Sequence, residues 1–192
     1  MTALILGLIL FLGAHSIRIF AEPWRDRTIS RLGEKPWKAA LSLLSLAGFG
    51  LLIWGFGLAR HSPWPLWTPP VGLRHLAGAL MLLAFILLAA ANVPGNAIKA
   101  RLHHPMVIAV KVWAFAHLLA NGNAAHILLF GSFLVWAVLN FRAARARDRL
   151  AATVYPSGTI TATAITVVIG AAAWAFFAFW AHLAWIGVSP LG

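Results

Sequence analysis

The chain of 192 residues is 61% hydrophobic and only 10% charged, with a formal net charge of +11. A soluble domain of this length could not remove so much apolar surface from water, so the composition excludes a soluble globular protein. The chain has no cysteine, which excludes disulfides, thiolate haem ligation and cysteine-ligated zinc or iron–sulfur sites. The arginines flank hydrophobic stretches, where topology and anionic lipids account for them, so we expect no nucleic-acid binding.

Six apolar stretches predict membrane-spanning helices, because a spanning helix needs about 20 mostly apolar residues. The predicted helices cover residues 2–21, 37–59, 73–93, 105–120, 123–141 and 161–188. The first stretch is too long for a signal peptide and lacks a basic start and a small-residue cleavage site, so we expect it to be retained. The sequence therefore predicts an all-α fold, a polytopic membrane bundle of about six transmembrane helices in a single domain, 1–192.

Two connections have clear turn chemistry. The segment Asn121-Gly122-Asn123 separates the fourth and fifth stretches and predicts a tight antiparallel helical hairpin. Between the second and third stretches, residues 61–70 include four prolines, which forbid a regular helix, and two tryptophans, which suit the membrane interface.

The distribution of basic residues predicts the orientation. They gather in the first, third and fifth connections, as Arg25, Arg27, Arg31, Lys35, Lys99, Arg101, Arg142, Arg145, Arg147 and Arg149. Because cytoplasmic loops carry an excess of lysine and arginine, these connections are predicted to be cytoplasmic. Both termini then lie on the outer face.

Histidines inside apolar stretches are the candidate functional residues. An ionisable side chain in hydrocarbon is costly without a partner, so each is a functional hypothesis. Neutral imidazole is a good ligand for haem iron, copper or zinc. His15 and His117 are the most deeply placed by sequence, whereas His126 and His182 lie nearer the outer ends. The alternative for each is an interhelical hydrogen bond, which is common between membrane helices.

Two basic side chains belong to the same hypothesis. Arg18 lies one turn from His15 towards the cytoplasm and could meet a carboxylate such as a haem propionate. Lys111 lies about six residues into the fourth stretch. Its ammonium could reach the cytoplasmic interface along the four-carbon stem, or face the bundle interior and pair with a propionate or a substrate anion.

Several segments together resemble a known family. They are His15-Ser16 in the first stretch, the segment 32–36 before the second, His103-His104-Pro105, and then Ala116-His117 followed by the polar turn at 121–123. In this combination the chain resembles the NnrU family of bacterial membrane proteins, named from denitrification, and their relatives the 15-cis-zeta-carotene isomerases. The resemblance covers most of the chain.

The resemblance implies haem b held by two axial histidines, which fall on His15 and His117. It also implies a multi-pass protein of the bacterial inner membrane. Along the helices, at about 1.5 Å per residue, His15 lies some 9 Å and His117 roughly 18 Å from the cytoplasmic ends. A shared iron therefore requires the His-Pro segment to enter the membrane or the helices to tilt strongly. Otherwise His104 is the better partner by depth, and it is the reserve ligand.

Three functions follow as hypotheses. The first is a haem protein linked to nitrogen-oxide metabolism by redox or gas-binding chemistry, with nitric oxide as ligand. The second is haem-dependent cis–trans isomerisation of a carotenoid-like polyene. The third is a membrane assembly factor without a cofactor, whose histidines only join helices. A membrane methyltransferase shares the His-Pro signature but carries glutamates after the hairpin, where this chain has Asp148 as its only acid.

Overall fold

The computed structural model describes residues 1–191, and every regular element in that range is helical. The elements are α1 (Thr2–Phe20), α2 (Glu22–Leu32), α3 (Glu34–His61), α4 (Val71–Asn92), α5 (Ala97–Leu102), α6 (Pro105–Ala120), α7 (Ala124–Leu150), α8 (Ile160–Phe176), the π-helical turn η1 (Phe177–Ala181) and α9 (His182–Ile186). The expected all-α class is confirmed over the described residues.

Five helical stretches are long and apolar enough to cross a membrane. They are Thr2–Phe20, Glu34–His61, Val71–Asn92, Ala124–Leu150 and Ile160–Ile186. Helix α6 is apolar too but has only 16 residues, which is short for a full span. The composition and these stretches make the chain a multi-pass membrane protein. Five of the six expected spans meet the length that a crossing requires.

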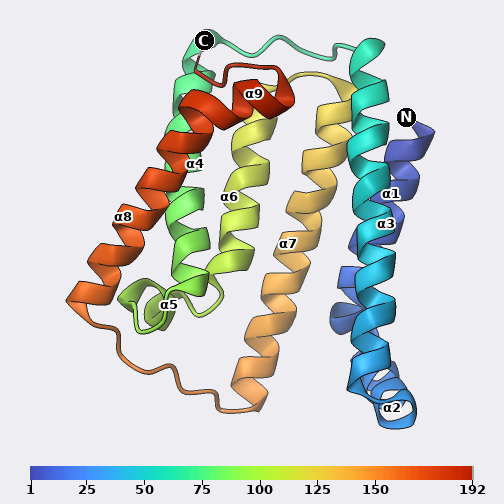
Figure 1. Ribbon diagram of the computed structural model, residues 1–192, viewed down its shortest axis with the longest axis vertical. Coiled ribbons are helices and arrows are strands. Elements are labelled where there is room, and N and C mark those ends of the chain that lie inside the picture. Colours follow the sequence, from blue (N-terminus) through green and yellow to red (C-terminus); the bar gives the residue numbers. More distant parts are fainter. Residues whose placement is uncertain (192) are drawn as a thin grey trace.

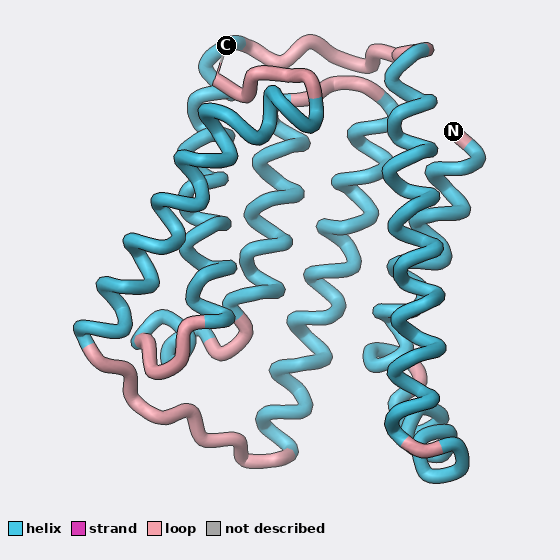
Figure 2. The backbone as a smooth tube through the Cα atoms, viewed as in Figure 1, coloured by secondary structure: helices cyan, strands magenta, loops and turns pink. Residues whose placement is uncertain are grey.

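The helices pack side by side in a curved series. Helix α8 packs on α4, α4 on α6, α6 on α7, α7 on α1, and α1 on α3 (Figures 1 and 2). The two ends of the series are joined by α9, because Nη1 of Arg60 on α3 donates a hydrogen bond to the Ile186 carbonyl at 2.8 Å. Figure 1 places both chain termini at the same end of the bundle.

Helices α1 and α3 approach so closely that their contact requires glycine. A Cβ atom at Gly7 would lie 2.6 Å from the backbone nitrogen of Leu52, and one at Gly48 would lie 2.7 Å from that of Phe11. A Cβ at Gly55 would meet the backbone nitrogen of Leu4. Small residues let membrane helices approach to backbone contact, where van der Waals packing replaces the hydrophobic effect.

The structure differs from the expected helices in three places. The first and third connections contain helices α2 and α5, and α7 continues past the expected end at residue 141 to Leu150. Alanine and arginine favour helix, and no glycine or proline interrupts 141–150, so α7 ends only after it leaves the apolar region. The expected helix 161–188 is interrupted by η1, and Gly187, at φ +78°, follows α9 in the left-handed conformation.

The predicted turns are confirmed. Residues 63–70 are irregular, and the hairpin between α6 and α7 is tight. The irregular segment and the hairpin turn are hydrogen-bonded to each other. The backbone nitrogens of Leu66 and Trp67 donate to the Gly122 carbonyl at 2.8 and 3.3 Å. A Cβ atom on Gly122 would collide with the Trp67 carbonyl, so this contact depends on glycine.

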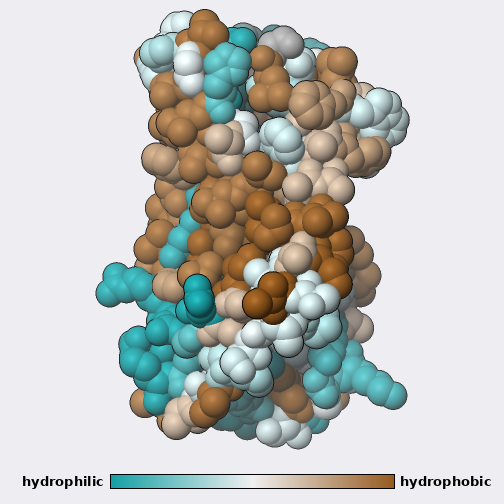
Figure 3. Space-filling model, turned by 90° about the vertical axis from the view of Figure 1, so that its left-hand side faces the viewer, coloured by the Kyte–Doolittle hydropathy of each residue, from teal (hydrophilic) through white to brown (hydrophobic). Residues whose placement is uncertain are grey.

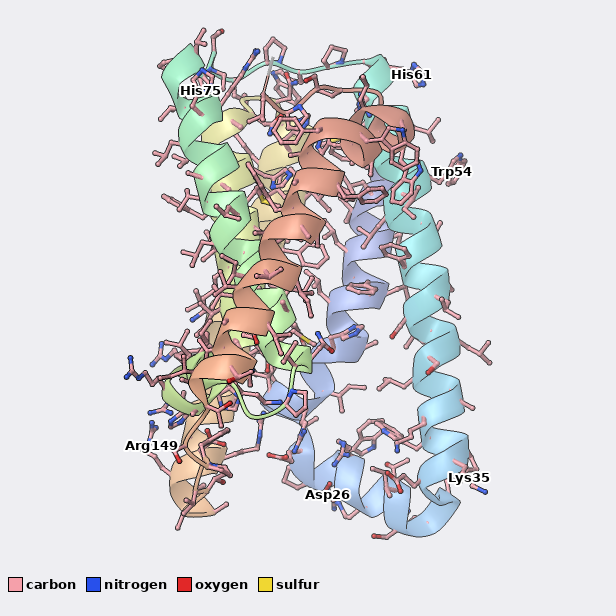
Figure 4. All side chains as sticks on the ribbon, turned by 60° about the vertical axis from the view of Figure 1, so that its left-hand side comes forward. Asp26, Lys35, Trp54, His61, His75 and Arg149 are labelled. Atoms are coloured by element: carbon pink, nitrogen blue, oxygen red, sulfur yellow. The ribbon has the colours of Figure 1, made fainter. Side chains whose placement is uncertain are left out.

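Charged residues concentrate at one end of the bundle. Asp26, Lys35 and Arg149 lie at the end opposite to His61 and His75 (Figure 4). A space-filling view from the side shows hydrophobic side chains around the middle of the molecule and most hydrophilic ones at the end that carries α2 and α5 (Figures 1 and 3). This separation is what a bilayer requires of a protein that crosses it.

Candidate histidine site

His15 and His117 make the same local hydrogen bond. The Nδ1 atom of His15 lies 2.7 Å from the Phe11 carbonyl, and Nδ1 of His117 lies 2.8 Å from the Trp113 carbonyl. In both cases the partner is the residue four positions earlier, one helical turn towards the N-terminus. Each ring is therefore oriented by its own helix.

This bond determines the tautomer of each ring. A carbonyl oxygen only accepts hydrogen bonds, so Nδ1 must carry the proton in both histidines. In a neutral imidazole the other nitrogen, Nε2, then has a free lone pair. No residue among 1–191 is hydrogen-bonded to either Nε2 atom. A backbone carbonyl on Nδ1 and a bare Nε2 is the usual arrangement of a metal-binding histidine.

Aromatic rings connect the two histidines. The His15 ring lies 4.4 Å from Phe11, measured between centroids, and Phe11 lies 5.8 Å from Phe133 of α7. Phe133 lies 5.3 Å from Trp113, which lies 5.3 Å from His117. The region between His15 on α1 and His117 on α6 is thus filled by rings from three helices.

The two rings are offset along the bundle. His15 lies edge-on to Trp136 at 6.2 Å, whereas His117 stacks on Phe130 at 4.4 Å. Both partners belong to α7, and six residues of helix rise about 9 Å. The depth difference expected from the sequence therefore remains in the fold. One iron shared by both Nε2 atoms requires α1 and α6 to shift relative to each other.

The two basic candidates have different surroundings. The Arg18 side chain is mostly exposed, and its Nε lies 3.3 Å from Oε1 of Glu22, an exposed pair of little energetic weight. Nζ of Lys111 lies 3.7 Å from the centre of the Phe141 ring on α7, a cation–π contact. Lys111 therefore contacts a neighbouring helix near the charged end of α7, which is compatible with both alternatives for its ammonium.

The reserve ligand His104 is engaged elsewhere. Its Nε2 lies 2.7 Å from Oδ2 of Asp148, which also accepts a 3.1 Å hydrogen bond from the Tyr155 hydroxyl. Nη1 of Arg145 is hydrogen-bonded to Nδ1 of His103. These side chains join the α5–α6 connection, the end of α7 and the segment 151–159 at the charged end of the bundle.

The same cluster includes an aromatic stack. The His103 ring lies 4.1 Å from Tyr155 at an interplanar angle of 18°. Burial and the neighbouring Asp148 carboxylate raise the pKa of Tyr155, so its hydroxyl stays protonated and donates. The pairing of Asp148 with His104 was not predicted. In the sequence, Asp148 stands out only as a single acid among arginines. Its partner His104 lies 44 residues earlier, so nothing local points to the pair.

Asp148→Ala is expected to lower the stability of the fold by about 2 kcal/mol, because it removes hydrogen bonds to a charged group from a mostly buried cluster. Thermal unfolding in detergent, together with the rate of proteolysis within 151–159, measures the effect. Asp26→Ala is the matched control, since Asp26 is exposed and pairs only with its neighbour Arg25. Equal melting temperatures for the two variants would contradict the role of this cluster.

Two further histidines lie at the start of α7 and in α9. His126 of α7 lies 5.0 Å from Phe56, and its Nδ1 is buried without a hydrogen-bond partner. Nδ1 of His182 donates to the Val188 carbonyl at 2.6 Å. Among residues 1–191, no three histidine or acidic side chains are grouped closely enough to hold a metal ion. Two axial histidines suffice for haem, so the donor chemistry of His15 and His117 fits that group.

Comparison with known proteins gives one match. The family model described as NnrU protein matches residues 3–190, nearly the whole chain. No curated protein and no solved structure matches.

Proposed function

Because the chain belongs to the NnrU family, we propose that it is a multi-pass membrane protein that binds haem b through His15 and His117. One observation carries the proposal. Of the histidines within the helices, these two have Nδ1 bonded one turn back to a carbonyl, an aromatic ring beside the imidazole and no protein partner on Nε2 among residues 1–191; His15 is exposed and His117 is partly buried. Aromatic rings and apolar walls would pack against a porphyrin, as in other cofactor pockets.

Bound haem b would supply one-electron chemistry and, where one histidine is displaced, a position for nitric oxide. The residues of the chain orient and hold it. The Phe11 and Trp113 carbonyls keep the Nε2 lone pairs available on the two rings. Arg18 is exposed enough to exchange its Glu22 partner for a propionate, and Lys111 offers a second cation above Phe141. We propose a role in nitrogen-oxide metabolism on this chemistry and on the family.

The proposed location is the bacterial inner membrane, with both termini on the outer face. The end that carries α2, α5 and the last turns of α7 holds most of the arginines, and the positive-inside rule makes it cytoplasmic. Both termini lie at the opposite end (Figure 1).

The first test is an absorption spectrum of the detergent-purified protein, oxidised and dithionite-reduced, with haem quantified after extraction. A split low-spin b-type spectrum at about one haem per chain is expected, because two neutral imidazoles give a six-coordinate iron. A colourless protein that cannot be reconstituted with haem would refute the proposal and favour the assembly factor without a cofactor.

An alternative function is haem-dependent cis–trans isomerisation of a carotenoid-like polyene. The observation that favours it is an apolar groove of about 750 Å³ between α1 and α7, which includes Trp136, the residue that contacts the His15 ring. Incubation of the reduced haem protein with a cis polyene, followed by chromatography of the isomers, distinguishes this activity from gas binding.

A further inference from the structure

The groove between α1 and α7 is open along the side of the bundle. It has a volume of about 750 Å³, and aliphatic side chains make most of its wall. Five other residues line it: Trp136, the glycines Gly13 and Gly131, and the serines Ser16 and Ser132, with one glycine and one serine from each helix. Both helices qualify as membrane spans, so the groove opens towards the bilayer, and a molecule dissolved in the bilayer can enter from this side.

The two serines leave hydrogen-bond donors in the groove. Neither hydroxyl has a hydrogen-bond partner among residues 1–191, and neither is sealed from the surface. Trp136 also lines the groove, but its indole N–H is buried away from the open surface, so the two serine hydroxyls are the donors that an occupant can reach. An indole N–H can only donate, and a hydroxyl can donate. Unpaired polar groups are costly at membrane depth, so an occupant with acceptor oxygens would be stabilised there.

The two glycines keep the groove free. A Cβ atom at Gly13 or Gly131 would meet no other atom within 4 Å. This differs from the α1–α3 contact, where glycines such as Gly55 are required because the helices touch. The absence of a side chain at Gly13 and Gly131 therefore leaves space and does not serve helix packing.

We infer that this groove binds an isoprenoid quinone. Such a molecule is dissolved in the bilayer, its chain matches the aliphatic wall, and its two carbonyl oxygens accept from the hydroxyls of Ser16 and Ser132. A hydrocarbon polyene offers no acceptor. The ester carbonyls of a phospholipid lie near the interface, so they could reach Ser16, four residues before the end of α1, but not Ser132, which is eight residues, about 12 Å, from the start of α7. The inference does not rest on haem binding.

The test uses the full chain in phosphatidylcholine nanodiscs with radiolabelled decylubiquinone, and empty nanodiscs give the background. Saturable binding at about one quinone per chain is expected. Gly131→Leu fills open space, so the fold is kept while quinone affinity falls at least tenfold. The double variant Ser16→Ala/Ser132→Ala should weaken binding by about tenfold, the effect of two lost hydrogen bonds. Gly50→Leu on α3 is the matched control, since Gly50 also faces open space but does not line the groove.

Three outcomes would overturn the inference. The first is background-level or unsaturable binding of the quinone to the wild-type protein, and the second is unchanged binding to Gly131→Leu. The third is unchanged affinity in the double serine variant together with equal displacement of the quinone by a hydrocarbon polyene or by phosphatidylglycerol. His117→Ala should leave quinone affinity unchanged within about twofold, because His117 on α6 does not line the groove and contacts Trp113 and Phe130, which do not line it either. This result separates the quinone site from the haem proposal.

Discussion

His15→Ala and His117→Ala are each expected to reduce the haem content of the purified protein to below about a tenth of the wild-type value. Even partners that only orient a metal ligand are typically worth about 10- to 100-fold in affinity, and these substitutions remove the ligand itself. Extracted haem per chain and the reduced-minus-oxidised spectrum measure the loss. Added imidazole should partly restore a low-spin spectrum in either variant, because the cavity left by the ring admits it.

Controls come from histidines outside the pair. His61→Ala changes an exposed side chain at the C-terminal end of α3, and His126→Ala removes a ring that lies against Phe56. Both should retain haem. If His117→Ala kept a normal bis-histidine spectrum while His104→Ala lost it, the ligand of α6 would be His104. That result would also mean that the His104–Asp148 hydrogen bond breaks when haem binds. Equal haem content in all the variants would refute the pair.

Gly55→Leu is expected to prevent stable packing of α1 on α3, at a cost of about 3 kcal/mol or more. The new Cβ would collide with the backbone nitrogen of Leu4, and neither helix backbone can move aside without losing the contacts around Leu8 and Leu52. The variant should show a lower melting temperature in mild detergent and a smaller yield of monodisperse protein in size-exclusion chromatography.

The matched control is Gly57→Leu, two residues further along α3. A Cβ atom at Gly57 meets nothing within 4 Å, so the added side chain faces open space. The two variants share residue type, helix and propensity cost and differ in what the side chain meets. A melting temperature for Gly55→Leu within about 2 °C of that of Gly57→Leu would contradict the close approach of α1 and α3.

Much of the site could not be predicted, because the sequence does not show how each helix is turned about its own axis against its neighbours. Both alternatives for Lys111 were compatible with its position in the apolar stretch, and only the orientation of α6 against α7 places its ammonium over Phe141. The groove between α1 and α7 was missed for the same reason. Its two glycines look like those of the α1–α3 contact in sequence, yet they face open space.

The sequence by itself determined the membrane class, the long apolar helices, the hairpin at 121–123 and the histidines worth testing. These features depend on local hydropathy, turn chemistry and helical period, which a segment carries with it wherever it packs. The tertiary structure decided that Asp148 pairs with His104 and that α9 reaches Arg60. Those relations depend on how far the helices slide and turn against each other. Contacts across tens of residues set that geometry, and no single segment contains it.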